Sequence, residues 1–255
     1  QNNVGGNYNS AVGFAALQLN TEGDSNTASG YFSLYANTTA SENTAMGFES
    51  LKANTTGGSN TGIGEAALRG NTTANNNTGI GRQALYTNTS GASNTAVGKA
   101  ALFANTTANN NTALGYQAML DNTTGAGNTA VGRNALDNNT TADNNTSVGS
   151  LSMHDNTTGA SNTAVGHASL ASNTTGQHNT ASGFESLKAN TTGNVNTASG
   201  YQALLSNTTG WGNLALGNST LDANTTGIKN IAVGGASLSA NTTGNQNVAV
   251  GYNSL

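Results

Sequence analysis

The sequence predicts an all-β chain, a parallel β-solenoid or β-roll built from fifteen coils of seventeen residues. A glycine recurs at a constant spacing of seventeen residues, fifteen times from Gly13 to Gly251, and 255 residues are fifteen whole periods without an insertion or deletion. Such a fixed period is typical of stacked repeats. Some columns of the repeat hardly vary, which separates packed positions from exposed ones. Thr, Asn, Gly and Val, which form helices poorly, are abundant in every coil.

The first element of each coil is the phrase T-A-V-G, for example residues 95–98, which predicts a short strand. We number each coil from its glycine, such as Gly98, as position 0. Position −2 is always small, as at Ala96, and position −1 is apolar in twelve coils, as at Val97. Neighbouring strand residues point to opposite faces. We therefore expect Ala96 to face inward and Val97 outward.

The outward residues at −3 and −1 form a stripe. It becomes fully apolar in the last three coils, at Leu214, Leu216, Ile231, Val233, Val248 and Val250. A long exposed apolar stripe is a liability unless another chain covers it. We therefore expect the chain to associate side by side with copies of itself.

The second element is x-x-A-L-x, which we expect to be a second strand. Position +4 is Leu in thirteen coils, as at Leu102, and Met at 119 and 153. A column this uniform predicts a buried side chain, and the small residue at +3 predicts a narrow interior.

The third element, N-T-T-G, has the composition of a turn. Ala replaces its glycine at positions 40, 74, 108 and 142, so this turn does not need positive φ in every coil. Asn stands at −4 and at +7 in every coil, as at Asn94 and Asn105. These side chains can stack into amide ladders between coils. They can also act simply as turn formers, and the two interpretations are compatible.

Composition limits the possible functions. Only 7% of residues are charged, the net charge is −4 and there is no cysteine. The few Lys and Arg form no basic patch, so we expect no nucleic-acid partner, and no apolar run is long enough for a membrane span in this segment. His154, His167 and His178 fall in three different variable columns. We therefore expect no catalytic site, no metal site and no cofactor; any ligand-binding residues stay unknown. N-T-T is formally a glycosylation sequon, but an inward Asn cannot carry sugar.

Two further patterns bear on binding. Aromatic residues gather at +1, and they either cover a groove between chains, which we favour, or stack on sugars. Thr fills +8 and most of +9, which suggests ice binding as the alternative function. Adjacent strand residues face opposite ways, however, and a two-column Thr face would need T-x-T.

The phrase at residues 91–101, GASNTAVGKAA, recurs along nearly the whole chain. It resembles the YadA-like head repeats of trimeric autotransporter adhesins. This resemblance implies a left-handed parallel β-roll, three chains wound side by side, and a bacterial surface or a related extracellular or viral fibre. It also implies a structural or adhesive rod that contacts a host, surface or matrix ligand.

Residues 1–255 are expected to be one uninterrupted repeat array. Solenoids normally carry capping repeats, and none is apparent in the sequence. We therefore expect the array to continue in a longer chain, or to stack end to end into a filament, at the cell surface or outside the cell.

Overall fold

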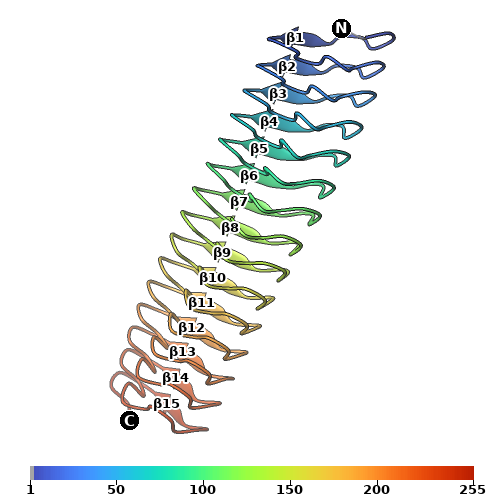
Figure 1. Cartoon of the computed structure of the whole chain (residues 1–255). Coiled ribbons are helices and arrows are strands. Elements are labelled where there is room, and N and C mark those ends of the chain that lie inside the picture. Colours follow the sequence, from blue (N-terminus) through green and yellow to red (C-terminus); the bar gives the residue numbers. More distant parts are fainter. Residues whose placement is uncertain (1–2) are drawn as a thin grey trace. The chain divides into compact units, whose positions relative to one another are not determined.

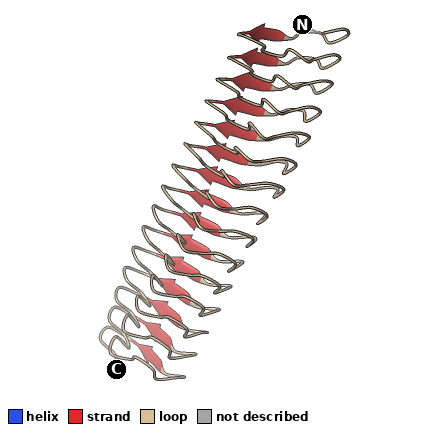
Figure 2. Cartoon of the chain, in the orientation of Figure 1, coloured by secondary structure: helices blue, strands red, loops and turns tan. Residues whose placement is uncertain are grey.

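The computed structural model describes residues 3–255 and confirms the all-β parallel solenoid. Each coil contributes one strand of three residues, and the described residues contain no helix (Figure 2). The first strands are β1 Ser10–Val12, β2 Thr27–Ser29, β3 Thr44–Met46, β4 Thr61–Ile63, β5 Thr78–Ile80, β6 Thr95–Val97 and β7 Thr112–Leu114. The others are β8 Thr129–Val131, β9 Thr146–Val148, β10 Thr163–Val165, β11 Thr180–Ser182, β12 Thr197–Ser199, β13 Leu214–Leu216, β14 Ile231–Val233 and β15 Val248–Val250.

The chain forms two compact units, Gln1–Gly127 with β1 to β7 and Asn128–Leu255 with β8 to β15. Within each unit, every strand pairs in parallel with the strand of the next coil (Figure 1). The register is one whole repeat, so that Ala96 lies opposite Ala113 and Val97 opposite Leu114. A column in the sequence is therefore a column in space.

The second strand expected at x-x-A-L-x is wrong, because this segment is a series of turns. Positions +2 and +4 have positive φ in every coil, for example 54° at Ala100 and 51° at Leu102. A left-handed conformation at two alternate residues cannot continue an extended strand. The turns still bond between coils: the Leu102 N–H donates to Ala118 O at 2.9 Å, and the Ala100 N–H to Arg82 O at 2.9 Å.

The core is narrow and lies where the columns predicted it. Leu102 and Ala96 are fully buried, as are Met119 and Met153. A buried Leu or Met side chain contributes about 1.5–3 kcal/mol each. Where +3 is Ser, its hydroxyl is satisfied inside the core; Ser33 Oγ, for example, donates to Ala45 O at 2.8 Å.

Candidate functional site

The two asparagine columns form hydrogen-bonded ladders, as the sequence predicted. In the −4 ladder, Asn94 Nδ2 donates to Asn77 Oδ1 at 3.2 Å, and the Asn94 backbone N–H reaches the same oxygen at 2.9 Å. In the +7 ladder, Asn105 Nδ2 donates to Asn88 Oδ1 at 2.7 Å. All four side chains are fully buried. The +7 Asn of the formal sequons from Asn37 to Asn224 is likewise fully buried and therefore inaccessible to a glycan, whereas Asn241 is partly buried.

The ladders meet at one carbonyl in each coil. Ala108 O accepts from Asn94 Nδ2 at 2.8 Å and from Asn105 Nδ2 at 3.2 Å. The same arrangement recurs at Ala40, where Asn26 and Asn37 both donate. If one of these amides is displaced, it loses a hydrogen bond within its own coil and another to the neighbouring coil, and the partners of both bonds are left unpaired. This gives a physical reason for Asn at both positions of every coil.

Position 98 requires glycine because of its backbone conformation and the close approach of the next coil. The φ of Gly98 is +136°, and a Cβ there would lie 2.3 Å from Gly115 O in the next coil. The turn glycine at +10 differs: Gly91 has no positive φ, which agrees with the Ala found at that position elsewhere.

Sequence reasoning missed a role for position +11. Asn75 Oδ1 accepts the backbone N–H of Gly58 at 2.7 Å, and Asn109 Oδ1 accepts that of Ala92 at 2.7 Å. The side chain of one coil thus caps the backbone of the coil before it. The alternation of Asn75, Ala92 and Asn109 was the available signal.

The apolar stripe comprises the −3 and −1 side chains that flank the buried −2 residue. Val97 in this stripe is half-buried. Met46, Leu114, Val165 and Ile231 are between 40% and 46% exposed. The outward direction predicted for this stripe is confirmed.

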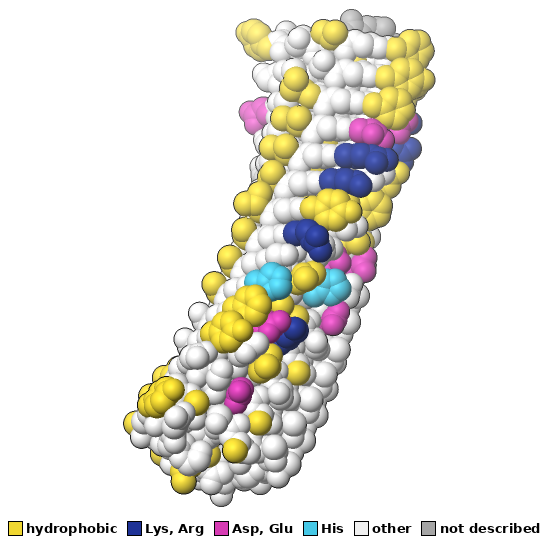
Figure 3. All heavy atoms as spheres, turned by 90° about the vertical axis from the view of Figure 1, so that its left-hand side faces the viewer, with side chains coloured by type: hydrophobic (Ala, Val, Ile, Leu, Met, Phe, Trp, Pro, Cys, Tyr) yellow, Lys and Arg dark blue, Asp and Glu magenta, His cyan; other side chains and the backbone are white. Residues whose placement is uncertain are grey.

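A second surface, the mixed band, comprises the side chains at +1, +2 and +5. Within each unit, Figure 3 shows large hydrophobic side chains close to charged and histidine side chains on the surface. In the first unit, Tyr31 stacks between Phe14 and Phe48, with ring centroids 5.3 and 5.4 Å apart. In the second unit, Phe184 stacks with His167 at 5.3 Å and with Tyr201 at 5.4 Å. Rings stacked in this way cover one another's faces.

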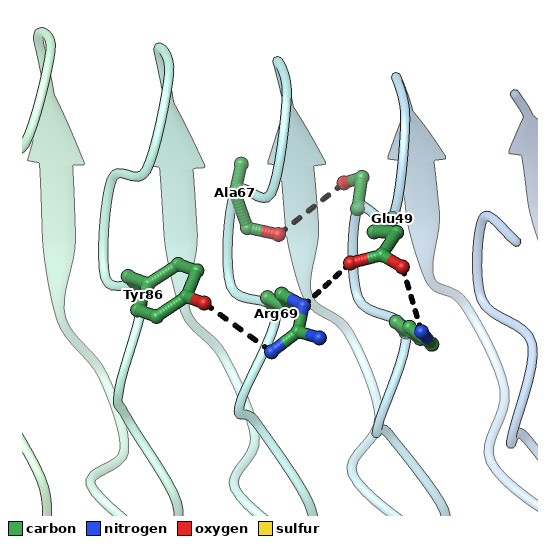
Figure 4. Close-up of polar contacts among 6 residues, drawn as sticks. Glu49, Ala67, Arg69 and Tyr86 are labelled. Atoms are coloured by element: carbon green, nitrogen blue, oxygen red, sulfur yellow. Dashed lines mark hydrogen bonds and ion pairs between the residues drawn. The ribbon is translucent and has the colours of Figure 1, made fainter. Parts of the chain in front are cut away.

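The mixed band also carries ion pairs, and one network crosses three coils (Figure 4). Glu49 accepts from Lys52 Nζ at 2.7 Å and from Arg69 Nε at 2.6 Å, and Arg69 Nη1 donates to Tyr86 Oη at 3.3 Å. The hydrogen bond from Lys52, helped by Arg69, holds the pKa of Glu49 below its usual value. The hydrogen bond to Glu49 raises the pKa of Arg69.

The same eleven-residue phrase builds the same pair in the second unit. Residues 183–193 repeat residues 47–57, GFESLKANTTG. Lys188 Nζ donates to Glu185 Oε1 at 2.6 Å. The second donor to Glu185 is Gln202 Nε2 at 2.9 Å, from the +2 column, whereas the second donor to Glu49 is Arg69, from the +5 column. The pKa of Glu185 is lowered by the hydrogen bond from Lys188 and then by that from Gln202.

The histidines lie apart. His154 contacts Asp155 at 2.7 Å and Asp137 at 3.5 Å, His167 stacks on Phe184, and His178 is exposed. Among residues 3–255, no group of three or more His, Asp or Glu is arranged to hold a metal ion. The described chain also has no helix long and apolar enough to cross a membrane.

The two threonine columns do not form a flat surface with two parallel rows of free hydroxyl groups, as ice binding would need. Thr106 Oγ1 donates to Thr123 O at 3.2 Å, and the +8 hydroxyls of other coils make the same bond. Thr107 at +9 is exposed. One hydroxyl of each Thr pair is therefore already used by the fold.

No family model, curated protein or solved structure matches this chain. The similarity to YadA-like head repeats consequently rests on the repeat phrase alone. The structure itself supports the coarser statement, a parallel β-solenoid with seventeen-residue turns.

Proposed function

We propose that this chain is a structural segment of an extracellular fibre or adhesin head, in which copies associate side by side through the apolar stripe. The observation that carries this proposal is the partial exposure of the stripe in coils that lie inside each unit, as at Met46 in β3 and Val165 in β10. Covering exposed apolar side chains of this kind removes apolar surface from water and favours association.

A second copy of the chain is the occupant that suits the stripe best. Strands of consecutive coils repeat about every 4.8 Å. Two identical stripes can therefore match side chain to side chain over many coils, as in self-complementary interfaces. The resemblance to YadA-like repeats supports three chains. A purely mechanical or adhesive role also fits the scatter of ionisable residues, and we expect no enzymatic activity.

Light scattering of the whole chain over a range of concentrations tests the association. We expect a multimer, and a double variant with Val97→Lys and Leu114→Lys should be monomeric with an unchanged circular dichroism spectrum. Thr107→Lys with Thr124→Lys is the matched control, because it adds equal charge at two exposed +9 positions in the same coils. A parent that stays monomeric at every concentration would contradict side-by-side assembly.

The surface location has its own test. Protease treatment of intact cells of the source, followed by immunodetection, should remove the protein if it lies outside the cell. Protection of the protein until the cells are lysed would contradict the extracellular role and leave the assembly result unaffected.

The structure offers no observation that favours ice binding over this role. The +8 hydroxyls are engaged with backbone carbonyls, and the exposed +9 residues form a single column.

A further inference from the structure

The mixed band of the first unit contains a hollow of about 380 Å³ beside β5, β6 and β7. Its floor is Ala100, which lies in the +2 column between Gln83 and Gln117. Both glutamines also line the hollow. The short alanine side chain between two long ones is the local cause of the cavity.

One wall of the hollow is cationic. Arg82 and Lys99 occupy the +1 positions of successive coils and both line the hollow. Arg82 Nε lies 3.2 Å from Glu65 Oε2, but both side chains are about half exposed, and such pairs are weak. Lys99 Nζ lies 5.5 Å from the ring centroid of Tyr116, and it has no carboxylate partner among residues 3–255. Both cations can therefore turn toward a bound anion.

Two apolar side chains also line the hollow. Phe103 and Leu120 occupy +5 of successive coils and line the hollow. Phe103 stacks on Tyr86 with a centroid distance of 5.1 Å and an interplanar angle of 1°, which fixes the orientation of its ring. A hollow lined by both apolar and charged groups suits a ligand with one C–H face and several oxygen atoms, which is the character of a sugar ring.

Asp121 also lines the hollow and decides between classes of anion. Its carboxylate is exposed, it can accept a hydrogen bond from a hydroxyl group, and it repels a second negative charge. A polyphosphate or nucleic-acid strand would bring negative charge along its whole length. A sugar acid carries one anionic group and several hydroxyl donors, so its carboxylate can face Arg82 and Lys99 while a hydroxyl faces Asp121.

We propose that this hollow binds a short acidic saccharide, whose carboxylate pairs with Arg82 and Lys99 and whose ring packs against Phe103. The volume lies near the lower end of that of ligand pockets, which suits one or two sugar units. All lining residues belong to one unit of one chain. Binding at this hollow therefore does not depend on the side-by-side association proposed above.

Titration of the whole chain with digalacturonate, followed by isothermal calorimetry, tests the proposal. We expect saturable binding that weakens with salt, and little or no binding of the neutral disaccharide cellobiose. Lys99→Gln and Arg82→Gln should each weaken binding roughly tenfold, because each removes a charge-assisted bond. Lys229→Gln is the control, since Lys229 lies over the Trp211 ring at 4.7 Å in the second unit and should leave binding unchanged.

Ala100→Gln gives an independent test, because it fills the hollow with a side chain that the +2 column already holds at Gln83 and Gln117. It should abolish binding and leave the melting temperature unchanged. Ala168→Gln makes the same change in the same column of the second unit and should have no effect on binding.

Equal affinity for cellobiose, or undiminished binding by Ala100→Gln, would overturn the proposal. Tighter binding of single-stranded DNA than of digalacturonate would also overturn it. If Ala100→Gln fails to fold, the comparison of Lys99→Gln with Lys229→Gln decides alone. Repeating the titration on the Val97→Lys, Leu114→Lys variant separates sugar binding from self-association, because the two can fail independently.

Discussion

Single residues in this solenoid carry unusual backbone conformations. In every coil, positions −5, +2 and +4 have positive φ, although most of these residues are not glycine. Each left-handed residue costs about 1–2 kcal/mol. The cost is offset locally, because residues with positive φ also bond to a neighbouring coil, as Leu102 does to Ala118. Side chains inside the core and backbone bonds between coils thus stabilise the same turns.

Asn105→Ala should destabilise the fold by about 1–3 kcal/mol, because it leaves the buried Asn88 Oδ1 without its ladder donor. Urea unfolding monitored by circular dichroism measures the loss. Thr107→Ala, two residues away and exposed, is the control and should change stability little. Equal stability of the two variants would mean that the ladder contributes nothing.

Gly98→Ala should be more damaging. A φ of +136° costs a residue with a side chain about 1–3 kcal/mol, and the new Cβ would also overlap Gly115 O. Gly58→Ala is the matched control, because Gly58 lacks positive φ and its column holds Ala at position 92. Thermal unfolding should show a clear drop for the first variant only. A melting temperature for Gly98→Ala equal to that of Gly58→Ala would contradict the steric argument.

At the scale of elements, the sequence predicts the strand at T-A-V and the turn at N-T-T-G, because both depend on local residue types. It does not predict the turns around Leu102, because nothing in a leucine or alanine side chain signals positive φ. Their conformation comes from bonds to adjacent coils. The +11 caps such as Asn75 were missed for a related reason: they act on a backbone seventeen residues away. The hollow around Ala100 depends on the lengths of side chains in three coils and becomes apparent only when the coils are stacked.

The turn that bears Glu49 should give a small dependence of stability on pH. The pKa of Glu49 is lowered in the folded state from 4.5, so its stabilising contribution is present above that value and is lost as pH falls through the folded pKa. The effect should be below about 1 kcal/mol, because the cationic partners are partly exposed. Comparing urea unfolding of the parent and Glu49→Gln at neutral pH and at about pH 3 measures it. Glu49→Gln should cost stability at neutral pH and little in acid, and a cost independent of pH would contradict this assignment.

For the molecule as a whole, stability should come from coil stacking and should not depend on a metal ion. Buried amides, carbonyls and hydroxyls satisfy one another between coils, as at Asn94, Asn105 and Ala108. We therefore expect the same melting temperature with EDTA, with calcium and with neither. A calcium-dependent rise of several degrees that is reversed by EDTA would reveal a site that this arrangement does not explain.

The one-repeat register of the ladders has a genetic consequence. Removing residues 98–114 from the chain would join Val97 to Gly115, and each column would continue with the same kind of donor, acceptor and core residue. Unequal recombination between repeats can therefore add or delete seventeen codons without leaving a buried group unpaired. A gain or loss of one codon displaces both asparagine columns at once. Gene length in such a lineage should consequently vary in steps of whole coils, with substitutions accumulating at +1, +2 and +5, where a new side chain changes the surface and leaves the stack intact.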